Sequence, residues 1–211
     1  MKKLVIFDLD GTLLDTIADL AESANYALKQ LDYPTHPVDA IRTFVGNGIN
    51  KLLERALPAH EQTEENIMRM RSHFVPYYDI HNADLSTPYP GIVSLLEDLQ
   101  AKGILIAVAS NKYQEATVKL VKQYFPNIDF VEILGQREGI NVKPDPSIVF
   151  DLYKTTKEKQ EREDAERKEP AAFSQSETFN VWMRYGFDTE SLVRSWEWGK
   201  MSDGYKKMMK E

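Results

Sequence analysis

Two aspartates, Asp8 and Asp10, follow a run of four apolar residues in the segment 4–16, which reads LVIFDLDGTLLDT. On an extended chain their side chains point to the same side, because residues two apart share a face. Carboxylates this close repel each other, and burial raises the cost of keeping both charged. A hard divalent cation with oxygen ligands, such as Mg²⁺, would relieve the repulsion. Asp8 and Asp10 are therefore the candidate metal ligands.

The same pair suits phosphoryl transfer. A carboxylate beside such a cation can attack phosphorus and form an aspartyl phosphate, the role that we assign to Asp8. Asp10 can protonate the leaving oxygen and then activate water. Gly11 lets the backbone approach a phosphate closely. A single aspartate after a strand is usually only a turn or a helix cap, but the whole run Asp-x-Asp-Gly-Thr favours the chemical interpretation.

Three short apolar runs predict the strands that must position this pair. They occupy residues 4–7, 104–110 and 130–134. Each is continuous and rich in β-branched or aliphatic residues, which is typical of a buried parallel strand. Stretches with helical spacing at residues 91–103 and 115–124 lie between them. The alternation indicates an open parallel sheet with helices on its faces, and such sheets bind ligands at the carboxyl ends of their strands.

The connection after the first strand is too long for an ordinary loop and has apolar residues at helical spacing, so we expect an inserted helical domain. After residue 153 the chain becomes almost entirely charged, as in a solvated helix or a disordered linker. Two or three short helices are expected beyond it, with patterns at 174–186 and 188–200. The predicted division is a core at 1–15 and 82–153, a helical insertion at 16–81, and a C-terminal part at 154–211.

Composition limits the classes of partner. The chain has 211 residues, 42% of them hydrophobic, which is enough for a packed core. Its net charge of −7 disfavours nucleic acid or an anionic membrane as the main partner. There is no cysteine, which excludes disulfides and thiolate metal sites. No apolar run is long enough to span a bilayer, and acids interrupt the only signal-like segment, so we expect a cytoplasmic protein.

Three motifs in order resemble the haloacid dehalogenase-like (HAD) phosphatase superfamily. The first is DLDGTLLDT, the second is VASN at the end of the next strand, and the third is VKPDP. The resemblance implies that Ser110 and Lys143 hold phosphate and steady the nucleophile, with hydroxyl and ammonium as electrostatic partners of the transferring group. It also implies Mg²⁺ as cofactor, bound by Asp8 and the backbone carbonyl of Asp10. The implied phosphate-binding set is Asp8, Gly11, Thr12, Ser110, Asn111 and Lys143.

The insertion resembles the small helical cap of phosphoglycolate phosphatase-like members, carried by FVGNGINKLLERAL. In that interpretation Gly46, Asn47 and Gly48 form a loop that faces the site; in the alternative they only start the following helix. Asn111 and Lys112 are weaker candidates for substrate contact. The resemblance covers residues 1–153 and implies an α/β fold with a Rossmann-like sheet and a helical cap. Three strands of that sheet are readable, and the helical C-terminal tail, which does not match the family, is expected from the residue pattern alone. The expected substrate is a small phosphorylated metabolite similar to phosphoglycolate.

The chain departs from the family pattern after Lys143. The family's fourth motif, a strand that ends in Gly-Asp and completes the metal site, has no counterpart, and Asp188 or Asp203 would be poor substitutes. Without that strand the first strand lies at a sheet edge, which must be covered. Tail residues could cover it, or the edge or the tail could support self-association. The alternative to an active phosphatase is therefore a catalytically impaired, HAD-derived binding or assembly protein. The tail residues suited to this packing are Phe179, Trp182, Met183, Leu192 and Trp196.

Overall fold

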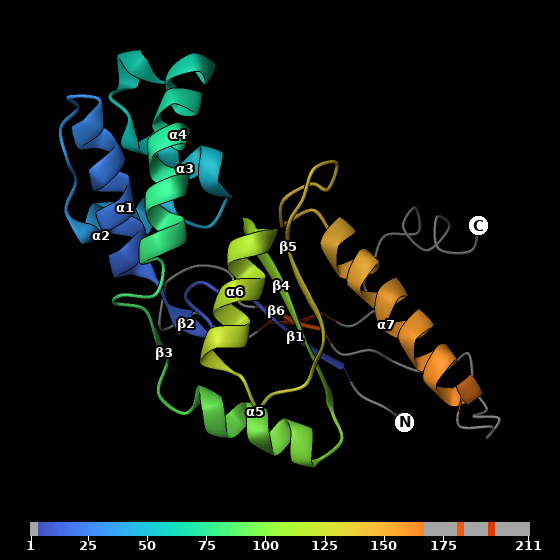
Figure 1. Ribbon diagram of the computed structural model, residues 1–211. Coiled ribbons are helices and arrows are strands. Elements are labelled where there is room, and N and C mark those ends of the chain that lie inside the picture. Colours follow the sequence, from blue (N-terminus) through green and yellow to red (C-terminus); the bar gives the residue numbers. More distant parts are fainter. Residues whose placement is uncertain (1–3, 167–180, 184–193, 197–211) are drawn as a thin grey trace.

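The computed structural model describes residues 4–166, 181–183 and 194–196 (Figure 1). Its central sheet has three parallel strands in the order β1-β4-β5, formed by Leu4–Phe7, Leu105–Tyr113 and Phe130–Gln136. Phe7 pairs with Val108, and Val108 pairs with Ile133, so the carboxyl ends of the strands lie together. The predicted α/β fold with three parallel strands is confirmed.

Helices cover both faces of this sheet. The alternation of β4 sends Ile106 and Val108 into one apolar cluster and Ala107 and Ala109 into another. The first cluster includes residues of α5 (Ile92–Ala101) and α6 (Gln114–Tyr124), and the second includes residues of α7 (Ser147–Glu166). Figure 1 shows α7 on the side of the sheet opposite α6. The result is a three-layer core.

The segment after β1 forms a helical unit with its own apolar centre. It comprises α1 (Ile17–Gln30), α2 (Val38–Phe44), α3 (Ile49–Ala56), the 3₁₀ turn Ala59–Glu61 and α4 (Glu64–His81). Leu28, Leu53 and Phe74 are among its fully buried side chains. Its two connections to the core pair as a short antiparallel ribbon, β2 (Leu14–Asp15) with β3 (Thr87–Pro88), which sequence patterns did not predict. These helices occupy the predicted insertion; that they act as a cap remains a prediction.

A buried carboxylate fastens α1 to the chain that leaves α4. Asp19, only 1% exposed, accepts hydrogen bonds from the Leu85 amide at 2.9 Å and the Ser86 amide at 2.8 Å. The Ser86 hydroxyl donates a third bond at 2.5 Å. A buried carboxylate is tolerated when donors satisfy its lone pairs in this way. Asp19 therefore fixes where the two connections of the helical unit meet.

The C-terminal part differs from the expected helical tail. The charged stretch after residue 153 continues α7 to Glu166 as a helix, in agreement with one of the two expectations for it. The prediction of helices at 174–186 and 188–200 is wrong at the described positions. There, Val181–Met183 (β6) and Arg194–Trp196 (β7) pair as antiparallel strands. Valine and tryptophan favour pleated surfaces, and a strand pairing outweighed the helical spacing.

The predicted edge position of the first strand agrees with the structure. Within the described residues β1 forms a ladder with β4 alone, and β6 lies beside β1 without joining its ladder (Figure 1). Asp188, Asp203, Phe179 and Leu192 lie outside the described residues. In the described part of the chain, no helix combines the length and the apolar character needed to cross a membrane.

Replacing Asp19 by alanine should destabilise the protein. The change leaves the Leu85 and Ser86 amides without their acceptor and removes the shorter of the two hydrogen bonds of the Ser86 hydroxyl, and we expect a loss of about 3 kcal/mol in the free energy of unfolding. Urea unfolding followed by circular dichroism measures it, with Asp98→Ala on the exposed face of α5 as the control. Equal stability of the two variants would contradict the anchoring role.

Candidate active site

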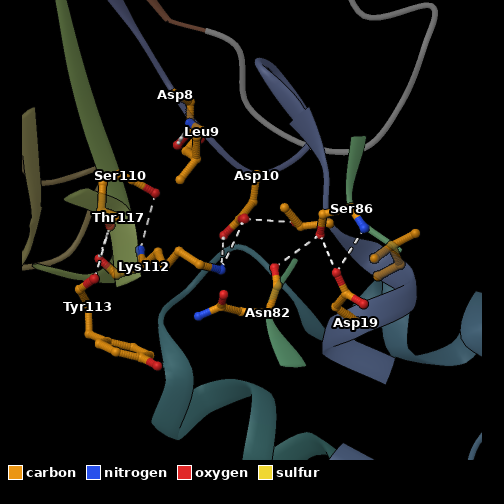
Figure 2. Close-up of polar contacts among 12 residues, drawn as sticks. Asp8, Leu9, Asp10, Asp19, Asn82, Ser86, Ser110, Lys112, Tyr113 and Thr117 are labelled. Atoms are coloured by element: carbon orange, nitrogen blue, oxygen red, sulfur yellow. Dashed lines mark hydrogen bonds and ion pairs between the residues drawn. The ribbon is translucent and has the colours of Figure 1, made fainter. Parts of the chain in front are cut away.

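The two aspartates at the end of β1 are each paired with a buried ammonium group. Asp8 Oδ2 lies 2.9 Å from Lys143 Nζ, and Asp8 Oδ1 accepts the Leu9 amide at 2.8 Å. The Asp10 oxygens lie 3.1 and 3.3 Å from Lys112 Nζ (Figure 2). Both lysine side chains are 3% exposed, whereas the Asp8 and Asp10 side chains are 20% and 15% exposed. The carboxylates therefore face the opening, and the cations lie behind them.

The second strand enters the site through a bulge. The parallel register of β4 and β5 is regular at Ala109–Leu134 and resumes at Tyr113–Gln136, so three residues of β4 lie opposite one residue of β5, Gly135. Successive residues of a regular strand point to opposite faces. The bulge lifts this restriction, and Ser110, Asn111 and Lys112 all line one pocket. Ser110 thus lies inside β4, whereas the sequence pattern had placed it at a strand end.

Gly135 is required by the bulge for steric reasons. A Cβ atom built on it would lie 2.6 Å from the Lys112 carbonyl oxygen and 2.6 Å from Thr117 Oγ1. The Gln114 side chain accepts the Gly135 amide hydrogen at 2.5 Å and donates to the Ile133 carbonyl at 3.0 Å, which satisfies the β5 backbone there. Gly135 therefore supports the main chain that carries Lys112.

Asn111 connects three parts of the chain through its amide group. Its Nδ2 donates to the Gly46 carbonyl at 2.7 Å and to the Lys143 carbonyl at 3.1 Å, and its Oδ1 accepts the Lys143 amide at 2.7 Å. Lys143 Nζ also donates to the Ala109 carbonyl at 2.8 Å. These bonds hold Lys143 against the end of β4. They give Asn111 a positioning role, because both ends of its amide already have backbone partners.

Most of the predicted residues lie around one pocket. Those that line it are Asp8, Asp10, Ser110, Asn111, Lys143, Gly46 and Gly48, together with Lys112. Asn47 is exposed and is not among the lining residues. Gly11 and Thr12 are not among them either, and their amides donate within the turn, to the Leu14 and Leu9 carbonyls. The sequence thus predicted the floor of the pocket, and it missed the aromatic wall.

That wall comes from α4, where the buried Tyr78 lies against Lys112. The Lys112 ammonium is 4.6 Å from the centre of the Tyr78 ring, a favourable cation–π distance. Burial, followed by the nearby negative charges of Asp10 and Asp19, raises the pKa of Tyr78 well above its ordinary value. The phenol therefore stays neutral at physiological pH. A tyrosine at helical spacing gave no sign of this role in the sequence.

The donor set at the pocket is compatible with a Mg²⁺ ion that shares its coordination with substrate. Asp8 and the Asp10 carbonyl would hold it, and waters and phosphate oxygens would complete the six ligands, a pattern that Mg²⁺ commonly adopts. Within the described residues, no group of three or more Asp, Glu or His side chains gathers into a metal site. The described part of the chain thus offers fewer carboxylates here than the family pattern implies.

Substituting Gly135 by alanine tests the bulge. The added methyl group must displace the β4 backbone, and we expect a loss of about 1–3 kcal/mol in stability with shifted amide resonances at Lys112 and Thr117. Urea unfolding and two-dimensional NMR measure both effects. Gly103→Ala is the comparison: its Cβ meets no atom within 4 Å, so it should leave those resonances unchanged, although its φ of 67° means that alanine there also costs some stability through backbone strain. Unshifted resonances in Gly135→Ala would contradict the steric requirement.

The chain is similar in sequence and in fold to known proteins. The profile of the haloacid dehalogenase-like hydrolase family matches residues 5–163. The phosphoglycolate phosphatase of Pasteurella multocida is 37% identical over 156 residues, which cover 71% of this chain and 70% of that protein. A solved structure from Lactobacillus delbrueckii subsp. bulgaricus has a TM-score of 0.67 at 34% identity, covering 73% of each chain. A predicted phosphoglycolate phosphatase from Haemophilus somnus has a TM-score of 0.65 at 33% identity, covering 72% of this chain and 70% of its own. The chain belongs to the haloacid dehalogenase-like hydrolase family.

Proposed function

We propose that this protein is a Mg²⁺-dependent phosphatase that hydrolyses a small phosphorylated metabolite such as phosphoglycolate, through an aspartyl-phosphate intermediate. The observation that carries the proposal is the pair Asp8 and Asp10 at the mouth of one pocket, each backed by a buried lysine. The names of relatives near 35% identity support the same activity class and suggest the substrate.

The first step uses Asp8 as nucleophile. Its carboxylate oxygen attacks phosphorus while the bond to the ester oxygen breaks, and Asp10 acts as the general acid that protonates the departing alcohol. Lys143, fixed by its bonds to Asp8 and the Ala109 carbonyl, keeps the nucleophile oriented and faces the charge on the phosphoryl oxygens. The buried Ser110 hydroxyl already accepts the Lys112 amide, so its own hydrogen is available to a phosphoryl oxygen.

The second step returns Asp8 to its starting state. Asp10, now a carboxylate, takes a proton from the water that attacks the aspartyl phosphate, and inorganic phosphate leaves. The Thr16 hydroxyl donates to Asp10 at 2.7 Å and holds that carboxylate at the end of the turn. A bound Mg²⁺, held by Asp8 and the Asp10 carbonyl, would supply charge stabilisation for the phosphoryl group.

Changing Asp8 to asparagine should abolish turnover. The amide cannot form the acyl phosphate, and we expect kcat for p-nitrophenyl phosphate to fall by roughly a thousandfold or more. Release of p-nitrophenol measures it.

Asp32→Asn is the matched control for this variant. It makes the same acid-to-amide change at an exposed turn position with φ of 58°, which asparagine tolerates, and it should keep wild-type rates. Equal activity in Asp8→Asn and wild type would exclude Asp8 as nucleophile.

Removal of divalent cations should stop the reaction. With EDTA we expect no measurable phosphate release, and excess Mg²⁺ should restore it while Ca²⁺ should not, since Mg²⁺ imposes the tighter octahedral geometry. A malachite-green assay on phosphoglycolate measures the free phosphate. Full activity in EDTA would exclude the metal requirement.

One alternative is a catalytically impaired binding or assembly protein, favoured because the described residues hold no cluster of three or more carboxylate or histidine side chains. It predicts no turnover by wild type at any Mg²⁺ concentration. Size-exclusion chromatography then distinguishes a binding protein from an assembly protein, because an assembly protein that uses the unpaired edge of β1 should self-associate. A monomer that turns over phosphoglycolate would exclude this alternative.

A further inference from the structure

Lys112 differs from the other cation of the pocket in what it faces. Lys143 is committed to Asp8 and to the Ala109 carbonyl, on the side of the nucleophile. Lys112 lies beside both oxygens of Asp10 and over the Tyr78 ring, where β4 meets the helical unit. Asp10 is the residue placed to protonate the leaving oxygen. Lys112 is therefore the cation on the side where the alcohol part of a substrate lies.

The wall beyond Asp10 is apolar. Of the described residues that line the pocket, only Asp8, Asp10, Lys112 and Lys143 carry charge. The helical unit contributes aliphatic and aromatic side chains to the lining, namely Leu20, Val45, Ile49, Leu52, Phe74 and Tyr78. A negative group of the alcohol part that enters this space loses water and needs a cation there. Lys112 is the cation that the pocket provides.

We propose that Lys112 is the specificity-determining residue of this site and binds a carboxylate on the alcohol part of the substrate. The inference rests on the phosphatase activity proposed above and deepens it. A leaving oxygen in hydrogen-bond contact with Asp10 brings atoms two or three bonds away within reach of Lys112 Nζ, which is 3.1 Å from the same carboxylate. The preferred class is thus the phosphate esters of short 2-hydroxy acids, in which the carboxylate is attached directly to the ester carbon.

The contacts of Lys112 leave it able to bind a substrate carboxylate while it stays beside Asp10. Its ammonium has three N–H donors, and the two hydrogen bonds to Asp10 do not use all of them. The Tyr78 ring holds the ammonium through a cation–π contact, which uses no hydrogen-bond donor. The bulge opposite Gly135 fixes its backbone, so the side chain is preorganised. A lysine that served only as the counter-ion of Asp10 would affect all phosphate esters equally.

The test compares two substrates that differ only in charge, 2-phosphoglycolate and its neutral amide, 2-phosphoglycolamide. The wild type should favour the acid in kcat/KM by about 10- to 100-fold, the value of a charge-assisted hydrogen bond in a dry pocket. Lys112→Met should bring the ratio near one, and Lys112→Arg should keep most of it. Lys102→Met, on the surface at the end of α5, is the matched control and should keep the wild-type ratio.

Two results would overturn the inference. One is an equal kcat/KM of the wild type for the two compounds. The other is a kcat/KM ratio in Lys112→Met that equals the wild-type ratio while both reactions remain measurable. If Lys112→Met does not fold, as judged by circular dichroism, the ratio is measured in Lys112→Gln, which should lose the preference for the acid, and in Lys112→Arg, which should keep it. A fall in both rates with a constant ratio means that Lys112 serves only Asp10.

Calorimetry separates this inference from the proposed function. Both compounds are titrated into wild type and Lys112→Met with Mg²⁺ under conditions of slow turnover, or into the Asp8→Asn background. If wild type hydrolyses neither compound nor p-nitrophenyl phosphate, the phosphatase proposal fails, yet tighter binding of the acid that depends on Lys112 still supports the carboxylate site. Binding of neither compound, or equal binding of both, overturns it.

Discussion

The central constraint in this protein is the electrostatic balance at the end of β1. Two carboxylates two residues apart cannot both remain charged near a buried strand without compensation. The fold supplies two ammonium groups from behind, Lys143 on Asp8 and Lys112 on Asp10, each side chain 3% exposed. Lys143 stands 135 positions further along the chain than Asp8, and Lys112 stands 102 positions further than Asp10, so the packed three-layer core is what brings them to the aspartates.

The bulge in β4 is the second requirement, because it lets one strand provide three consecutive groups. In a regular strand Ser110 and Lys112 would share a face and Asn111 would point away. Because three residues of β4 lie opposite the single residue Gly135, the side chains of all three can line the pocket, and each makes different contacts. The Ser110 hydroxyl accepts the Lys112 amide at the pocket, Asn111 holds the Lys143 loop and Gly46, and Lys112 reaches Asp10. A bulge beside a site commonly re-aims side chains in this way.

The sequence predicted the strands, the helical insertion and the floor of the site because each leaves a local pattern. Apolar runs mark β1, β4 and β5, and the spacing of Asp8 and Asp10 is itself the chemical signal. The importance of Lys112 and Gly135 depends on contacts with residues distant in the sequence. A single lysine or a single glycine leaves no local pattern from which such contacts could be predicted. Helical spacing near residue 181 was overridden by strand pairing, a tertiary effect that local propensity does not contain.

The charge count of the pocket bears on how metal and substrate would bind. Among the described residues that line it, two carboxylates and two ammonium groups cancel in formal charge. A neutral site attracts a divalent cation less strongly than one with an additional carboxylate. The phosphate of a substrate brings the missing negative charge, and Mg²⁺ binds readily through substrate phosphates. Cation and substrate would therefore strengthen each other's binding, because the two lysines that balance the half-buried aspartates leave the pocket without a net negative charge of its own.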